Sequence, residues 1–437
     1  MFKVKPIAIV PPKGAESFPQ LTNELLASVS AKFSRSNEGL DAILAKVDLN
    51  DPEASVARIL KFVDYGHASI GGLTGSITMA IEDVTMWMAY KLFEMAPHAD
   101  GQESSTRYIK LDESGLPDWK ELGLNDEDAA AVDAVAREGL QHYHKEYARL
   151  DALATEHPEL IKYPDGANDK VKARIRQNYA LDRARYFLPF ALKTNVILTQ
   201  TARAWCDTVS KIASLPQKEA QDLAVALTQN LAVFAPNLSR HARVKNGMKI
   251  NGEAADLCAH ANSVDRLANM PAKVYIPNAL ALPYGLDELR DRENRYDACS
   301  PEIAFATVDM QIDNIAIAEL RDLNRHRTGF RQSNLEQKGF YLPDEINWDS
   351  YEEFFAKVAN AHSMLQWKSG HVYSLFLGSQ TNFRHVMQLD KFVYEAELRT
   401  GPGAHYRYAQ HLRDAVKALE AHRIGVSPIN LGQGEPE

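Results

Sequence analysis

Apolar and polar positions follow two different periods along the first half of the chain. Apolar residues such as Leu40 and Ile43 recur at helical spacing, whereas residues 76–82 alternate as in a strand. The clearest helix begins near Asn125, where Asn125 or Asp126 can cap it and acidic residues favour the helix dipole. In chain order, the pattern predicts a largely helical segment over 20–64, a strand over 76–82, and helices over 86–93, 125–157, 171–186 with a continuation past Leu188-Pro189, and 216–234.

The second half repeats this order of elements. A strand is predicted over 305–312, followed by helices over 315–324, 350–377, 391–398 and 404–422. Residues 235–300 contain Pro236, Pro271, Pro277 and Pro283 and show no long period, so we predict an irregular segment there. Because the order recurs, we predict an α+β, helix-rich chain of two repeats, 1–235 and 236–437.

Composition narrows the class of protein. The formal net charge of −9 argues against a basic surface for nucleic acid. Cys206, Cys258 and Cys299 form no CxxC pair, which argues against a zinc knuckle or a disulfide framework and favours a reducing cytoplasm. The N-terminal apolar run is too short for a signal peptide, and no stretch approaches the roughly 20 apolar residues that span a bilayer. We therefore expect a cytoplasmic protein without a membrane or nucleic-acid partner.

Two familiar kinds of site are not predicted. No Walker loop and no GxGxxG sequence occurs, which argues against a P-loop or Rossmann nucleotide site. His142 and His144 are two residues apart and so face different sides of a helix, which makes them a poor metal pair. We expect no metal site.

One candidate anion site is the loop Glu103-Ser104-Ser105-Thr106-Arg107-Tyr108. It offers a carboxylate, hydroxyls and a guanidinium in one short run, and the preceding Gly101 allows a flexible backbone. Arginine and hydroxyl groups can hold a phosphate through hydrogen bonds. A capped turn with a surface ion pair explains the same composition.

Three further features carry candidate chemistry. Arg325-His326-Arg327 follows a predicted helix and offers an anion site for a pyrophosphate or a flavin, although cations at a helix C-terminus are also favoured by the dipole alone. Arg399 ends another helix before the Gly401-Pro402-Gly403 turn, as a capping cation or as a group that stabilises developing negative charge. His67, in Gly66-His67-Ala68-Ser69, is a structural or a functional histidine.

Together these motifs resemble the flavin-dependent thymidylate synthase (ThyX) family. The first repeat carries the GHAS, ESSTRY and ARYFLPF elements at 66–69, 103–108 and 184–190, but it has Met95-Ala96-Pro97 at the family's RHR positions and Ile212 at its terminal arginine. The second repeat shows the reverse pattern. It keeps Arg325-His326-Arg327 and Arg399, with His405 at the usual glutamine position, whereas Leu335 and Val372 replace the motif serine and the ARxxLPL arginine. The resemblance implies two complementary half-sites, each repeat being a small antiparallel sheet packed with long helices.

The resemblance also implies a reaction and roles. The reaction is reductive methylation of dUMP with FAD as cofactor and with methylenetetrahydrofolate and NADPH as co-substrates. The FAD-binding residues are Arg325, His326, Arg327, His67, Ser69 and Arg203. The nucleotide-binding residues are Glu103, Ser105, Arg107, Arg185, Asp322, Arg325 and Arg399, of which Ser105 and Arg399 are also assigned to catalysis.

Two departures from the family pattern leave the substrate open. Asp322 replaces a glutamine before the triad, and Gly72 replaces a glutamate after GHAS. A pyrimidine nucleotide related to dUMP is therefore an alternative substrate, and a flavin- or nucleotide-binding pseudoenzyme with a structural or regulatory role is an alternative function. The family's homotetramer implies a homodimer of this chain with four repeats.

Overall fold

A computed structural model describes most of the chain as two compact units. The described residues are 2–7, 21–34, 36, 40–47, 51–63, 71–106, 111–163, 165–280, 288–295, 297, 299–401, 404–422 and 431. Unit 1 comprises 1–104, 121–123 and 193–254, and unit 2 comprises 105–120, 124–192 and 255–437. The predicted repeats are consecutive in sequence, whereas these units interleave. The repeat boundary at 235/236 stays a prediction.

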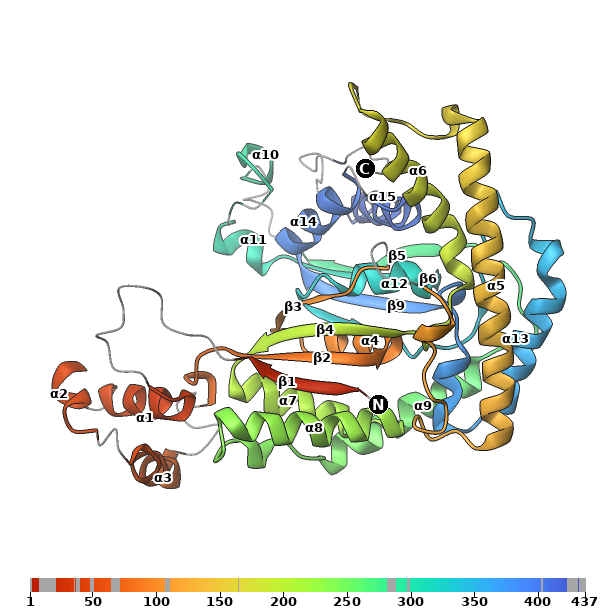
Figure 1. Ribbon diagram of the computed structural model, residues 1–437. Coiled ribbons are helices and arrows are strands. Elements are labelled where there is room, and N and C mark those ends of the chain that lie inside the picture. The colour runs from red at the N-terminus through yellow and green to blue at the C-terminus, as the bar shows by residue number, and fades with distance from the viewer. Residues whose placement is uncertain are drawn as a thin grey trace. The chain divides into compact units, whose positions relative to one another are not determined.

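Unit 1 is built on a four-stranded antiparallel sheet in the order β1-β2-β4-β3. Its strands are β1 (Lys3–Ile7), β2 (Ile77–Thr85), β3 (Asp100–Glu103) and β4 (Lys193–Gln200). Three helices, α4 (Met86–Met95), α7 (Ala202–Ile212) and α8 (Lys218–Phe234), contact the strands (Figure 1). The remaining helices of this unit are α1 (Asn23–Phe33), α2 (Leu40–Leu44) and α3 (Pro52–Val63), and α9 (Asn246–Asn262) begins in it.

Unit 2 contains a five-stranded antiparallel sheet in the order β5-β6-β9-β7, with β8 also paired to β9. Its strands are β5 (Lys273–Leu280), β6 (Thr307–Ala316), β7 (Phe330–Gln332), β8 (Gly339–Phe340) and β9 (Ser379–Gln388). Its helices are α5 (Asp126–Glu156), α6 (Asp169–Ala184), α10 (Glu288–Asp291), α11 (Pro301–Phe305), α12 (Ile317–Asn324), α13 (Glu352–Met364), α14 (Leu389–Arg399) and α15 (Tyr406–Glu420). The long helices α5 and α6 pack side by side, and α12, α14 and α15 contact the sheet (Figure 1). The predicted α+β class with two antiparallel sheets is confirmed.

The two sheets share a strand order and a local irregularity. The second strand of each sheet shifts register, between Ile81 and Val84 in β2 and between Ile312 and Ile315 in β6. Asp83 (φ 62°) and Asn314 (φ 57°) stand in these bulges with left-handed backbone. Aspartate and asparagine tolerate this conformation better than other residues with a side chain, so the sequence permits the same bulge twice.

Several strands were not predicted, and the omissions of β5 and β9 have a physical reason. Residues 193–200, where a helix was expected, form β4, and part of the irregular segment 235–300 forms α9 and β5. The predicted helix over 350–377 ends as α13 at Met364, and β9 follows at Ser379. Strand β9 lacks an apolar alternation because polar residues such as Gln380 and His385 are buried in it. Strand β5 tolerates Pro277 because it is an edge strand, where a missing N–H costs no ladder bond.

The chain segment after Arg185 is anchored by pairing with a second segment of unit 2. Pro189 bridges Phe376, the Phe190 amide donates to the Leu375 carbonyl at 2.9 Å, and the Leu377 amide donates to the Leu188 carbonyl at 2.8 Å. The first segment carries the ARxxLPL element, and the second carries Val372 at the position of that element's arginine. The pairing holds the turn that carries Arg185 in place.

The described helices include none with the length and apolar character of a transmembrane segment.

Candidate functional site

The Arg325-His326-Arg327 triad follows α12 directly, as the helical pattern predicted. The Glu319 carboxylate accepts from the Ala316 amide at 3.2 Å, which caps the start of this helix. At its end, one terminal nitrogen of Arg331 donates to the carbonyls of Asn324 (2.8 Å) and His326 (2.7 Å). Since these carbonyls lack helical partners, Arg331 stabilises the helix end and fixes the triad backbone.

His326 is joined to Arg399, the last residue of α14. Arg399 Nε donates to His326 Nε2 at 2.6 Å, and its Nη2 donates to the Asp322 carbonyl at 3.1 Å. Burial lowers the pKa of His326 well below its ordinary value, and the nearby Arg399 charge lowers it further. His326 is therefore neutral at pH 7, and its Nε2 accepts the hydrogen bond from Arg399. The structure thus unites the triad histidine and the terminal arginine in one cluster.

Arg185 is bound by an internal carboxylate. It stands in the 3-10 turn η4 (Arg185–Phe187), and both of its terminal nitrogens lie 3.1 Å from Asp322 Oδ2. Burial alone would raise the pKa of Asp322, but the charges of Arg185, Arg325 and Arg399 outweigh it and hold that pKa below its usual range. A phosphate bound to these two nitrogens would have to displace the carboxylate or use the second hydrogen that each nitrogen carries. The predicted phosphate-binding role of Arg185 therefore stays a prediction.

The predicted residues of unit 1 lie on the sheet edge and on α7. Glu103 ends β3, and Arg203 stands in the first turn of α7. Two guanidinium nitrogens of Arg203, Nε and Nη2, are buried with no hydrogen-bond partner among the described residues. Buried donors of this kind call for an acceptor, and a bound anion would supply one.

The expected flexibility at Gly101 is wrong. Gly101 lies inside β3, and a Cβ there would overlap the carbonyl oxygen of Ile197. Glycine is needed for the close approach of β3 and β4 rather than for a mobile loop.

The other predicted site residues are distributed as follows. Ser105 belongs to unit 2, whereas His67, Ser69 and Arg107 lie outside the described residues. Within unit 2 the structure brings together Arg185, Asp322, His326 and Arg399.

The first sheet has no counterpart of the triad. Asp83 and Asn314 are the left-handed residues of the two bulges. If the triad positions are placed after Asp83 as they stand after Asn314, they fall on Glu94, Met95 and Ala96, one residue earlier than when they are counted from Ser105. Neither count finds an arginine or a histidine. Ile212 and Arg399 both end 11-residue helices, so the alignment of those two positions agrees with the structure.

Sequence reasoning missed a buried acid beside this cluster. Glu395, one helical turn before Arg399, is fully buried, and its Oε2 lies 3.5 Å from Nδ1 of His385. His385 Nε2 lies 2.6 Å from the Thr328 carbonyl, so Nε2 carries the ring proton and Nδ1 presents a lone pair to the carboxyl group. That geometry favours a protonated Glu395. Burial likewise raises the pKa of Glu395 to about 8, against the charges of Arg399 and Arg331.

We expect Glu395→Gln to flatten the fall in stability above pH 6.5. The pKa of Glu395 is higher in the folded chain than in the unfolded chain. Its contribution to stability is therefore fully present below the pKa of the unfolded chain, and it is lost as the pH rises through about 8. The wild-type chain should lose up to about 1.4 kcal/mol per pH unit in this window, and the neutral glutamine should lose none of it. Urea unfolding at pH 6.5, 7.5 and 8.5 measures the difference, with exposed Glu420→Gln as control. Parallel pH profiles of the Glu395→Gln and wild-type chains would contradict a protonated Glu395.

Another buried acid, Glu319, has no counterpart in the sequence predictions. Its Oε1 accepts from the Tyr186 hydroxyl at 2.6 Å, and its Oε2 faces His411 Nε2 at 3.7 Å and Arg407 Nε at 3.9 Å. The feature of the sequence that could have identified Glu319 was its position three residues before Asp322 on α12. Glu319 ties the turn that holds Arg185 to α12 and α15.

Comparison with known proteins gives one family match. Residues 20–237 match the family model described as thymidylate synthase complementing protein. No curated protein matches the chain. Among solved structures, the UMP/dUMP methylase PolB from Streptomyces cacaoi bound with 5-Br dUMP has 16% identity, covers 55% of this chain and 94% of its own, and has a TM-score of 0.33. The same protein bound with 5-Br UMP has 16% identity, covers 55% and 93%, and has a TM-score of 0.34. At this identity and TM-score, neither likeness identifies a substrate.

Proposed function

The chain belongs, through residues 20–237, to the thymidylate synthase complementing protein family, and on this premise we propose that it is a flavin-dependent methyltransferase. The proposed substrate is dUMP or a related pyrimidine nucleotide, which is methylated reductively. The observation that carries the proposal is the 2.6 Å contact between Arg399 and His326. It joins the terminal arginine to the triad, the two elements that the resemblance assigns to one half-site.

The chain's own residues bind and polarise in this proposal. Arg399 stabilises negative charge that develops on the pyrimidine ring, a role that needs a cation in a fixed position. Its hydrogen bonds to His326 and to the Asp322 carbonyl supply that position. Arg325 and Arg327 lie on either side of His326 and attract the anionic groups of a cofactor and a nucleotide.

FAD is the proposed cofactor, and the residues of unit 1 fit one of its anionic groups. Arg203 presents the buried Nε and Nη2 that lack a partner among the described residues. A pyrophosphate or a reduced flavin would satisfy them. When bound, FAD supplies the hydride chemistry, with NADPH and methylenetetrahydrofolate as co-substrates. His67, Ser69, Glu103, Ser105 and Arg107 keep their predicted binding roles as part of this proposal.

We also propose a homodimer with four repeats. In this arrangement, each composite site takes its triad from one repeat and its nucleotide loop from another. The complementary losses at Val372 and Ile212 support it, because each repeat lacks what the other keeps. The end of the family match at residue 237 supports the division near 235/236.

A second candidate function is favoured by the ion pair between Arg185 and Asp322. A carboxylate of the chain already binds both terminal nitrogens that the resemblance assigns to a nucleotide phosphate. An anion site that is occupied by a carboxylate of the same chain is consistent with a binding protein that has lost turnover.

The absorption spectrum of the purified chain tests these alternatives. We expect bound flavin, or flavin uptake from added FAD, and bleaching by NADPH in the presence of dUMP. Rescue of a thymidine auxotroph would then report turnover. Flavin that NADPH does not bleach would favour the binding protein, and a colourless chain that takes up neither FAD nor a pyrimidine nucleotide would overturn both candidates.

A further inference from the structure

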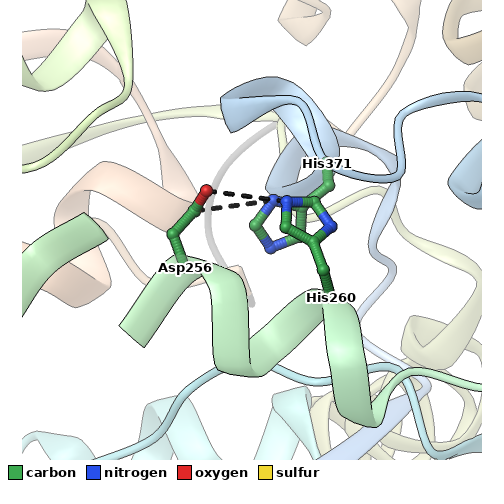
Figure 2. A group of neighbouring side chains, drawn as sticks. All are labelled: Asp256, His260 and His371. Carbon is green, nitrogen blue, oxygen red and sulfur yellow. Dashed lines mark ion pairs between the residues drawn. The ribbon is translucent and has the colours of Figure 1, made fainter. Parts of the chain in front are cut away.

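Unit 2 contains a cluster of two buried histidines and a partly buried aspartate that shares no residue with the Arg399 cluster. Asp256 and His260 stand four residues apart on α9 and therefore lie on the same helix face. His371 comes from η7 (Ser369–Ser374), and Figure 2 shows all three side chains converging on one point. One potential ligand atom of each residue lies within 4.8 Å of the other two.

The separations suit ligands of one ion better than hydrogen-bond partners. Asp256 Oδ2 lies 3.5 Å from His260 Nε2, and Asp256 Oδ1 lies 3.6 Å from His371 Nδ1 (Figure 2). Protein hydrogen bonds between nitrogen and oxygen are shorter, at about 2.7–3.2 Å. In a tetrahedral site with metal–ligand bonds of about 2.0–2.1 Å, neighbouring ligand atoms are separated by about 3.4 Å.

The buried side chain of His260 gives a second reason to expect a bound ion. Its side chain is 1% exposed, and its Nε2 has no hydrogen-bond partner among the described residues. Its other nitrogen, Nδ1, accepts from the Trp367 amide at 3.1 Å, so Nε2 carries the ring proton and points toward Asp256. A cation that binds Nε2 displaces this proton to Nδ1, so that the ligating imidazole stays neutral and Nδ1 no longer accepts from the Trp367 amide.

We propose that Asp256, His260 and His371 bind one Zn²⁺ ion or a chemically similar divalent transition-metal ion. Imidazole and carboxylate ligands suit such ions, and three protein ligands leave a fourth position for water. The ion would link α9 to η7, and the negative charge of Asp256 would offset part of its charge in the interior. This site is independent of the proposed function, because none of its ligands takes part in flavin or nucleotide binding there.

Titration with Co²⁺ tests the site. The full chain, without an affinity tag and stripped with a chelator, is titrated while the visible d–d absorption of Co²⁺ is recorded, and Zn²⁺ is then added. We expect the absorption of a four-coordinate site, its loss on addition of Zn²⁺, and a rise in melting temperature with either ion. Asp256→Asn and His371→Gln should each lower the Co²⁺ affinity by at least about tenfold.

Matched controls separate this site from exposed ligands. Asp349→Asn and His157→Gln change exposed residues of the same two types and should leave the affinity unchanged. Circular dichroism of the metal-free variants confirms that they are folded, and the two variants remove different ligands. A wild-type chain that gives no spectral or thermal response overturns the proposal, as does unchanged affinity in both ligand variants. Neither result depends on flavin binding or turnover.

Discussion

Asp322→Asn should lower the free energy of unfolding of this chain by about 3–5 kcal/mol. The substitution keeps the size of the side chain but removes its charge, and the buried Arg185 guanidinium loses the carboxylate that binds both of its terminal nitrogens. Breaking such a pair costs more than the pair contributes, because the remaining charge has lost its hydration. Denaturant unfolding at pH 7 measures the change.

The matched control for Asp322→Asn is a surface ion pair. Glu138→Gln breaks the contact of Glu138 with Lys357, where the two side chains are 27% and 44% exposed, and should cost at most about 1 kcal/mol. Replacing both partners, with Arg185→Met and Asp322→Leu together, should recover most of the loss. Equal effects of Asp322→Asn and Glu138→Gln would show that the Arg185 pair is solvated and not a buried ion pair.

Asp322→Asn also has a consequence for anion binding. Once the carboxylate is neutral, inorganic phosphate or dUMP can pair with Arg185 in its place. We expect phosphate to raise the melting temperature of this variant more than that of the wild-type chain. An equal response in the two proteins would count against a latent phosphate site at Arg185.

Arg399→Ala should reduce methylation of dUMP by about 10²–10³-fold, the usual effect of losing one group that stabilises developing charge. The variant loses both the cation and the hydrogen bond that holds His326. Flavin content should change less than turnover, because Arg325 and Arg327 remain. The measurement is turnover by wild-type and variant chains in parallel, with the flavin spectrum of each recorded.

Two further variants define the role of Arg399. Arg399→Lys keeps the charge but loses the planar arrangement of donors, so we expect partial rescue. Arg384→Ala removes an arginine that pairs with Asp309 on the sheet and is half exposed, and it should retain turnover. Full turnover in Arg399→Ala would refute the role that we give to this residue.

Local sequence was sufficient where hydrogen bonds are local. The helix predicted over 125–157 is α5 (Asp126–Glu156), and Asn125 caps it by accepting from the Asp128 amide at 2.9 Å. The helix before the triad ends at Asn324, as expected. Helical bonds join residues four apart, so composition and capping residues within one segment predict them.

Strands and clusters depended on residues far away in sequence. Residues 193–200 form β4 because they pair with β2 and β3, which no window around them contains. The carboxylate that occupies Arg185 comes from a residue 137 positions later. No metal site was expected from the sequence, and the His371 side chain meets Asp256 and His260 only through the fold.

The α+β class, the positions of most helices, and the placement of Arg325-His326-Arg327 and Arg399 at helix ends could therefore be predicted from the amino-acid sequence. Three contacts could not be predicted and follow from the packing of distant segments: Arg399 binds His326, Asp322 binds Arg185, and Glu395 is buried against His385. The physical reason is that helices are stabilised within one stretch of chain, whereas ion pairs and buried acids depend on which distant side chains the packing brings together.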